Sequence, residues 1–166
     1  DLKQSIAKMT AICLNFTCAD TSGNIGWQVS GRLPVRSENS GVIPFVVKDS
    51  TDNWNGWIKA DKMPQDFNPK KGWLGTCNHK TIDSQYPYYY SSHFSPSFRY
   101  RRLKQLFNSR DRFSLDDHWN FMRDTKNLMA EKIAPVMADV LKNHPDTQKM
   151  GEILSSWDYL DDADKA

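Results

Sequence analysis

The sequence predicts an α+β chain with a sheet-forming first part, residues 1–96, and a helical second part, residues 97–166. Around residues 12–31, apolar side chains alternate with polar ones, which is the period of a half-buried strand. After residue 97 apolar side chains recur instead every three or four positions, as they do in amphipathic helices. The two patterns together favour strands followed by helices.

The first part opens with apolar residues at helical spacing, so we expect the end of a helix within residues 1–11. Residues 12–18 and 25–30 are predicted strands, joined by a hairpin turn in which Gly23 supplies positive φ. Asp20 opens this turn. It could act near a substrate or a metal, but an Asp at this position usually caps its own backbone, and we favour the cap.

Residues 32–71 contain many Pro and Gly residues and little periodicity, so we expect a long irregular excursion. Long loops in compact domains are usually functional or belong to a larger assembly. Trp54 and Trp57 could line a pocket within it, but aromatic side chains in such loops more often anchor the loop to the core. We expect anchoring.

The Asn-Pro and Lys-Lys-Gly steps at residues 68–72 predict a turn, because Pro69 biases Asn68 away from helix. Residues 73–77 then read as a short further strand with Asn78 at its end. An amide held there can donate its NH₂ group to a developing oxyanion in acyl transfer. The alternative is an ordinary turn-forming Asn.

The second part is predicted to contain three helical regions. One begins near Ser97 and ends at residues 108–109, and the next begins after the N-cap Ser114. Pro135 should interrupt that helix, giving segments 115–134 and 135–143, and a last helix covers residues 146–156. The methionines of these helices (Met122, Met129, Met137 and Met150) are expected to fill the core.

Composition gives little support to nucleic-acid or membrane binding, and nucleic-acid binding is only a weak third option. The 166 residues carry a net charge of +2 with both signs interspersed, so nothing demands nucleic acid or a membrane. Tyrosines at residues 86–90 could stack on bases, but no extended basic stripe accompanies them. A mean hydropathy of −0.69 is low, yet the many aromatic residues argue against disorder and favour a piece of a larger protein.

The cysteines and histidines show no metal-binding or redox spacing. Cys13, Cys18 and Cys77 are expected to be free thiols, and Cys13 and Cys18 lie too close along one extended segment to pair. His118 and His144 are isolated, so exposed or capping roles are expected rather than metal binding.

Five separated blocks carry a resemblance to a known family. They are residues 19–27, residues 31–36, residues 68–73, Asn78, and residues 86–88 with the later Arg99. In this order they resemble the middle of the β-subunit of the penicillin acylase (penicillin amidase) family. The resemblance implies a fragment of an N-terminal nucleophile hydrolase, whose hairpin and further strand belong to an αββα sandwich followed by a helical segment.

The resemblance also implies a mechanism and two site residues. A serine exposed by autocatalytic cleavage attacks a linear amide bond of an N-acyl compound, with its own α-amino group as base. Asn78 would donate to the oxyanion, and Arg99 would orient the catalytic amine and the asparagine; the alternative for Arg99 is an ordinary surface arginine. The family's nucleophile lies upstream of residue 19, and the chain begins with Asp1, so we expect the chain alone to be inactive.

Further expectations follow from the resemblance. The partners would be the remainder of the β-subunit, an α-subunit and a small N-acyl amide, and the location periplasmic or extracellular. The family usually binds structural calcium, but residues 88–90 are tyrosines where an acidic ligand could occur, and phenols are poor Ca²⁺ ligands. His79 replaces a second asparagine common after the oxyanion residue. A non-catalytic ligand- or partner-binding module on the same scaffold is the alternative function.

Overall fold

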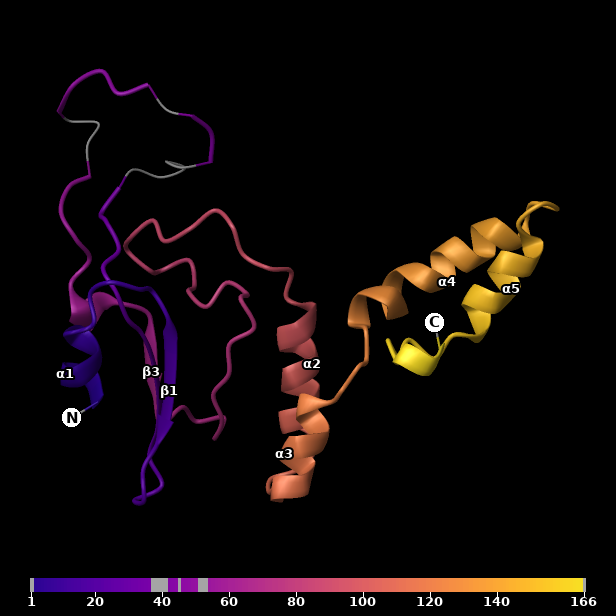
Figure 1. Ribbon diagram of the computed structural model, residues 1–166, viewed down its shortest axis with the longest axis horizontal. Helices are drawn as coiled ribbons and strands as arrows, with labels where there is room; N and C mark the ends of the chain where they lie inside the picture. Colours follow the sequence, from indigo (N-terminus) through magenta and orange to yellow (C-terminus); the bar gives the residue numbers. More distant parts are fainter. Residues whose placement is uncertain (1, 37–41, 45, 51–53, 166) are drawn as a thin grey trace. The chain divides into compact units, whose positions relative to one another are not determined.

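A computed structural model describes residues 2–36, 42–44, 46–50 and 54–165 of the chain (Figure 1). It divides into two compact units, Asp1–Ser95 and Pro96–Ala166. The first unit combines a small antiparallel sheet with a short helix, and the second is helical. Residues 37–41, 45 and 51–53 of the predicted excursion lie outside the described residues.

The sheet contains three antiparallel strands in the order β1-β2-β3. These are β1 (Asn15–Ala19), β2 (Ile25–Val29) and β3 (Gln65–Phe67), and helix α1 (Leu2–Ala7) precedes them. Asn15 pairs with Val29 at one end of the hairpin and Ala19 pairs with Ile25 next to the turn. The predicted hairpin and the predicted N-terminal helix are therefore confirmed.

The hairpin turn is held by Asp20, as expected for a capping residue. Its carboxylate accepts hydrogen bonds from the backbone N–H groups of Ser22 and Asn24, both at 2.9 Å, and from the Asn24 side chain at 2.8 Å. The Asn24 side chain and backbone bonds lower the pKa of the Asp20 carboxyl. Gly23 has φ +83°, the conformation that the turn requires.

Strand β2 lies between the other two strands and is buried on both faces. Trp27 and Val29 point to one side, where they form a core cluster with Ile58 and Met63. The opposite side carries Gln28, in register with Gln65 of β3, and faces α1. Because side chains alternate along a strand, one short segment connects both layers of this unit.

Strand β3 was not predicted, and Asn68 at its end explains its position. The Asn68 amide side chain accepts from the Ile25 N–H at 2.9 Å and donates to the Asn24 side chain at 2.8 Å. Its backbone N–H donates to the Ile25 carbonyl at 2.9 Å. The Asn-Pro turn thus fastens the third strand to the hairpin turn across 44 residues.

Two strand predictions are corrected. Residues 12–14 are not part of β1, because the Leu14 N–H bonds to the Ser30 hydroxyl at 3.2 Å, and Ser30 in turn donates to the Ile12 carbonyl at 2.7 Å. Residues 73–77 form no strand in the described structure, since neither edge of the sheet pairs with them. Trp73 is buried, so this segment is held by its side chain rather than by a ladder.

The anchoring role predicted for Trp54 and Trp57 is wrong for this chain. Their exposed fractions are 61% and 50%, and their rings contact each other edge-to-face with centroids 5.9 Å apart. Backbone bridging of Trp57 with Pro34 holds the segment instead. The described core is closed by Ile58 and Met63, which are smaller residues near these tryptophans in sequence.

The second unit contains four α-helices among its described residues. They are α2 (Phe98–Phe107), α3 (Leu115–Met122), α4 (Leu128–Lys142) and α5 (Gln148–Ser156). Ser114 and Asp117 form a reciprocal capping box at the start of α3, as the Ser114 prediction required. No helix in the described part of the chain is both long enough and apolar enough to span a bilayer.

The predicted helix break at Pro135 is wrong. The chain breaks earlier, between α3 and α4, where the Asn127 side chain accepts from the N–H groups of Met129 and Ala130 and starts a new helix. Pro135 lies inside α4, which continues through it. A strong N-cap therefore decides the boundary, while a proline costs one backbone hydrogen bond without ending this helix.

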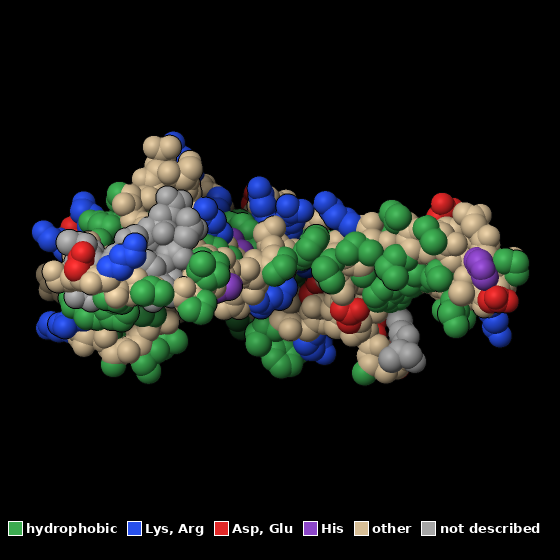
Figure 2. Space-filling view, turned by 90° about the horizontal axis from the view of Figure 1, so that it is seen from above, with side chains coloured by type: hydrophobic (Ala, Val, Ile, Leu, Met, Phe, Trp, Pro, Cys, Tyr) green, Lys and Arg blue, Asp and Glu red, His purple; other side chains and the backbone are tan. Residues whose placement is uncertain are grey.

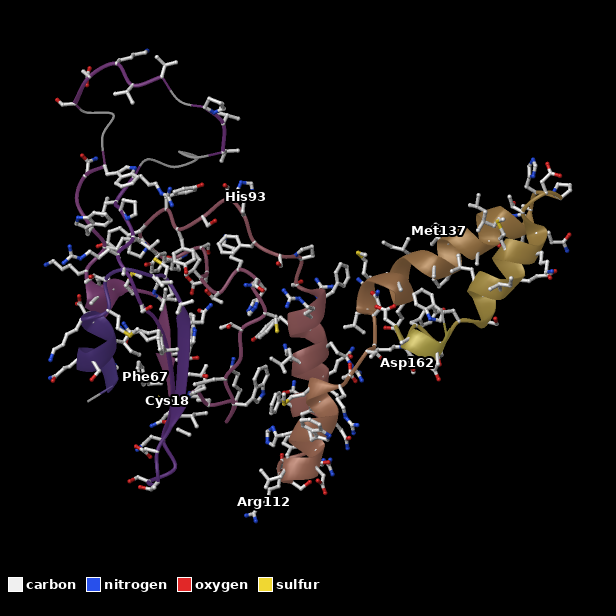
Figure 3. All side chains as sticks on the ribbon, in the orientation of Figure 1. Cys18, Phe67, His93, Arg112, Met137 and Asp162 are labelled. Atoms are coloured by element: carbon white, nitrogen blue, oxygen red, sulfur yellow. The ribbon has the colours of Figure 1, made fainter. Side chains whose placement is uncertain are left out.

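Helices α4 and α5 pack against each other, yet much of their apolar surface is exposed. Met137 of α4, labelled in Figure 3, is 52% exposed, and Met150 of α5 is 62% exposed. Met122, at the end of α3, is 77% exposed. Figure 2 shows hydrophobic side chains gathered on this helical unit. The expectation that the methionines fill a core is therefore wrong for this structure, in which Leu128, Ala134 and Ala138 are the buried residues of α4.

Candidate active site

A cavity of about 330 Å³ in the first unit brings Asn78 together with polar and aromatic side chains. They come from β1, from the segment after β2 and from two stretches near Asn78. The lining residues are Asn15, Leu33, Arg36, Thr76, Asn78, His79, Thr81, Tyr90, Ser91, His93 and Phe94. A second hollow, formed by residues 92–95, borders Asn78 on another side.

Asn78 lies in the left-handed region with φ +56°, which few residues other than Gly and Asn adopt without cost. Its carbonyl accepts a hydrogen bond from the Ser95 N–H at 2.8 Å, which ties the Asn78 turn to the segment before α2. The residue is exposed at the cavity. Its backbone is therefore fixed where its amide can reach a bound molecule.

His79 supports the same turn from the following position. Its Nδ1 accepts a hydrogen bond from the Cys77 N–H at 3.3 Å, so the bond spans Asn78. Burial, and then the charge of Lys71, lower the pKa of the imidazole from its ordinary value of 6.5. The ring is therefore neutral at pH 7, and its proton lies on Nε2 because Nδ1 is an acceptor.

Tyr90 lines the cavity, and other aromatic side chains pack around it. Tyr90 stacks on Phe94 with ring centroids 6.0 Å apart, and burial raises the pKa of its phenol. Tyr86 contacts Tyr90 edge-to-face and donates to the Lys62 carbonyl at 2.9 Å. Burial, with smaller effects of Tyr90 and Tyr88, raises the pKa of Tyr86 to about 12, so these phenols stay neutral.

Arg36 supplies positive charge beside these aromatic side chains. Its guanidinium carbon lies 5.5 Å from the centre of the Tyr89 ring, and Nη2 lies 3.5 Å from the Tyr90 carbonyl. Its Nε is buried without a hydrogen-bond partner among the described residues. None of the lining residues is acidic, so the cavity suits a neutral or anionic ligand better than a cation.

The described residues of this chain offer no cluster of side chains suited to a calcium ion. In the described ranges no three His, Cys, Asp or Glu side chains gather closely enough to hold a metal ion. Tyr88 and Tyr90 both contact the Tyr86 ring edge-to-face, and Tyr88 also packs against the core cluster. Calcium binding by the complete protein therefore stays a prediction, and the described residues of this chain do not add support for it.

Arg99 is the second residue of α2, in the helical unit Pro96–Ala166. It borders a cavity of about 300 Å³ that also has Asp124, Lys126 and Asp161 in its wall. On the next turn of the same helix, Arg102 forms a two-pronged pair with Asp124, with Nε and Nη2 at 2.8 and 2.6 Å from its oxygens. Arg99 is exposed at the edge of this charged cluster.

Sequence reasoning identified Asn78 but did not propose Arg36, Tyr90 or His93 as site residues. Arg36 had a usable signal, because it closes the 31–36 block of the resemblance. His93, labelled in Figure 3, had none, because it lies in an irregular segment and reaches the cavity only through the fold. The roles of Asn78 and Arg99 in catalysis stay predictions.

Comparison with known proteins identifies the family. The family model for penicillin amidase matches residues 1–166, the whole chain. The chain belongs to the penicillin amidase family. It is 38% identical over 102 residues to the acyl-homoserine lactone acylase QuiP of Pseudomonas syringae pv. tomato, covering 61% of this chain and 12% of that protein. It is 25% identical over 150 residues to the penicillin acylase 2 proenzyme of Pseudomonas sp. strain SE83, covering 90% of this chain and 19% of that protein.

A solved structure has a similar fold. The thermostable penicillin G acylase of Alcaligenes faecalis superposes with a TM-score of 0.68 at 23% identity, covering 96% of this penicillin amidase family chain and 30% of that structure. The curated relatives named above are far longer, since the chain spans 12% and 19% of their lengths. The mixed fold, with its antiparallel sheet and helices, is thus shared with a penicillin amidase.

Proposed function

We propose that this chain is part of an amide-hydrolysing N-terminal nucleophile enzyme and supplies its oxyanion donor through Asn78. The observation that carries the proposal is Asn78 itself, held at φ +56° beside a cavity of about 330 Å³. Membership of the penicillin amidase family supports the reaction class. The sheet then contributes to an αββα sandwich in the complete protein.

The proposed reaction begins at a nucleophile outside this chain. An N-terminal serine attacks the amide carbonyl, and its α-amino group takes the hydroxyl proton, since its unperturbed pKa lies close to neutrality. Negative charge develops on the carbonyl oxygen, and the Asn78 NH₂ group donates to it. The C–N bond then breaks, the amine leaves with a proton, and water hydrolyses the acyl-enzyme.

The remaining roles in the proposal belong to Arg99 of this chain and to parts of the protein outside it. Arg99 orients the catalytic amine and Asn78 in the complete enzyme, in which an α-subunit and the rest of the β-subunit complete the site. Residues 1–166 alone are inactive on this account, because the nucleophile and base are outside them. The substrate is a small N-acyl amide, and the enzyme acts in the periplasm or outside the cell.

The experiment compares Asn78→Asp and Asn78→Gly in the complete protein. Asp keeps the size of the side chain and removes the NH₂ donor, whereas Gly tolerates positive φ and removes the side chain altogether. Alanine is less informative, because it also strains the backbone at φ +56°. Both variants should lose about 100–1,000-fold in kcat on a chromogenic N-acyl anilide. Their thermal unfolding should match that of the unmutated protein.

The matched control is Asn143→Gly, which removes an exposed asparagine at the C-terminal end of α4, outside the cavity. Its kcat should stay at the unmutated level. Turnover by Asn78→Asp within a few-fold of the unmutated enzyme would remove Asn78 from the oxyanion role. Absence of hydrolysis of any N-acyl amide by the unmutated protein would favour the non-catalytic binding module.

A further inference from the structure

The His79 side chain forms a hydrogen bond across Asn78, to the Cys77 N–H, and this bond requires an unprotonated Nδ1. We propose that His79 is a positioning residue for Asn78, whose neutral imidazole holds the turn that presents the Asn78 side chain and makes the site sensitive to acid. The inference rests on the proposed function for its catalytic consequence. The hydrogen bond that carries it can be measured without catalysis.

Geometry supports this role directly. The Cys77 N–H donates to His79 Nδ1 at 3.3 Å, so the residues on both sides of Asn78 are joined. The Ser95 N–H holds the Asn78 carbonyl at 2.8 Å. The two bonds fix the backbone before and after a residue whose φ of +56° lies outside the common regions. His79 also lines the cavity that Asn78 borders.

Protonation reverses the role of Nδ1. A neutral imidazole has one acceptor nitrogen, but an imidazolium ion has two donors and no acceptor. Nδ1–H would then face the Cys77 N–H, and the bond that spans Asn78 would be lost. An amide side chain at this position would not behave in this way, because an asparagine Oδ1 accepts hydrogen bonds at every pH at which the protein is folded.

The surroundings of His79 favour the neutral ring. Lys71 is a positive neighbour, and Arg36, His93 and Tyr90 are the other charged or titratable groups that line the same cavity. Among the described residues, no carboxylate lines it to stabilise an imidazolium ion. Burial and Lys71 together lower the pKa of His79 below 6.5. The bond is therefore present at neutral pH and is lost as the pH falls through the lowered pKa of His79, below 6.5.

The kinetic test uses the complete protein, an N-acyl anilide, and the variants His79→Asn and His79→Phe. His79→Asn should retain kcat/KM within about threefold at pH 7.5, because Oδ1 replaces Nδ1 as acceptor. His79→Phe should lose about tenfold at every pH, because the turn loses its support. As the pH falls below 6.5, the unmutated enzyme should lose activity relative to His79→Asn, by at least about threefold.

His144→Phe is the matched control, because His144 Nδ1 also accepts a backbone N–H, from Asp146 at 3.3 Å, in the other unit. It should retain the unmutated pH profile. Identical profiles of the unmutated enzyme, His79→Asn and His79→Phe would overturn the proposal. So would a fall in activity that His144→Phe reproduces, because the effect would then not belong to His79.

A second measurement separates this proposal from the proposed function. Hydrogen–deuterium exchange resolved at the Cys77 amide should be at least about tenfold faster in His79→Phe than in the unmutated protein at pH 7.5. Equal exchange rates would overturn the His79 role whatever the activity. Faster exchange in a protein that hydrolyses no amide would overturn the proposed function while establishing the His79 bond.

Discussion

At the residue scale, Asn68 and Asn78 show why asparagine recurs where this chain turns sharply. Both have positive φ, at +49° and +56°, and both have a side chain that can bond where a glycine could not. Asn68 uses its amide to fasten β3 to the hairpin turn. Asn78 occupies a similar backbone conformation beside a cavity, which is where a donor amide can act on a ligand.

This comparison also shows the limit of sequence reasoning at single residues. The turn at Asn78 was predictable, because Asn at a segment end is a common turn former. The cavity was not, because Arg36 and Tyr90 are more than 50 residues apart and meet only in the folded chain. Asp20 could be predicted in full, since all its partners lie within four residues.

The Arg102–Asp124 pair gives a prediction for stability. Asp124→Asn should lower the free energy of unfolding by about 1–2 kcal/mol at pH 7, because a partly buried two-pronged charged bond is replaced by a neutral one. The hydrogen bond with Arg102 lowers the pKa of Asp124 below 3.8, so this stabilisation is present above pH 3.8 and is lost as the pH falls through the folded-state value.

Urea unfolding of the chain at pH 7 and at acidic pH tests the pair. Asp139→Asn, an exposed change on α4, is the control and should shift the free energy of unfolding by less than about 0.5 kcal/mol. Protonation of Asp124 should make the unmutated chain more like Asp124→Asn. A difference in free energy of unfolding between these two chains that grows as the pH is lowered would therefore contradict the assigned role.

At the element scale, local signals predicted the elements whose partners are near in sequence. The hairpin followed from period-2 alternation and a glycine-containing turn, and α3 followed from the cap at Ser114. β3 was missed because it is only three residues long, two of them polar, and because its partner strand lies about 40 residues away. The helix boundary before α4 was not predicted, because Pro135 was given more weight than the Asn127 cap. Only the cap changes the helix boundary.

The close packing of α4 and α5 gives an element-scale prediction at Gly151. A Cβ added there would lie 2.7 Å from the Lys142 N and 2.8 Å from the Ala138 carbonyl oxygen, and both are backbone atoms that cannot simply move aside. Gly151→Ala should therefore destabilise the chain by about 1–3 kcal/mol, although alanine favours a helix by about 1 kcal/mol over glycine.

Thermal or urea unfolding would detect this loss, with Ser155→Ala as the control on an exposed position of the same helix. The control should change the free energy of unfolding by less than about 0.5 kcal/mol. A stabilised Gly151→Ala chain would show that helix propensity outweighs the contact, and that α5 does not pack on α4 through this glycine.

At the scale of the whole molecule, the family was readable from separated sequence blocks, while burial was not. The methionines and tryptophans assigned to a core are exposed, because whether an apolar side chain is buried depends on surfaces that periodicity does not specify. Catalysis, like burial, depends on parts of the protein beyond the local sequence pattern. Under the proposed function, this chain supplies Asn78 and another part of the protein supplies the nucleophile. The chain spans only 12% and 19% of two relatives' lengths.

The most direct test of that account is intact mass spectrometry of the complete protein, stopped early in its reaction with an excess of an N-acyl anilide. We predict an acyl adduct on the N-terminal serine, threonine or cysteine of one subunit, and slower formation of the same adduct in Asn78→Asp. An adduct on an internal residue, or anilide hydrolysis that Asn78→Asp leaves unchanged, would contradict the account.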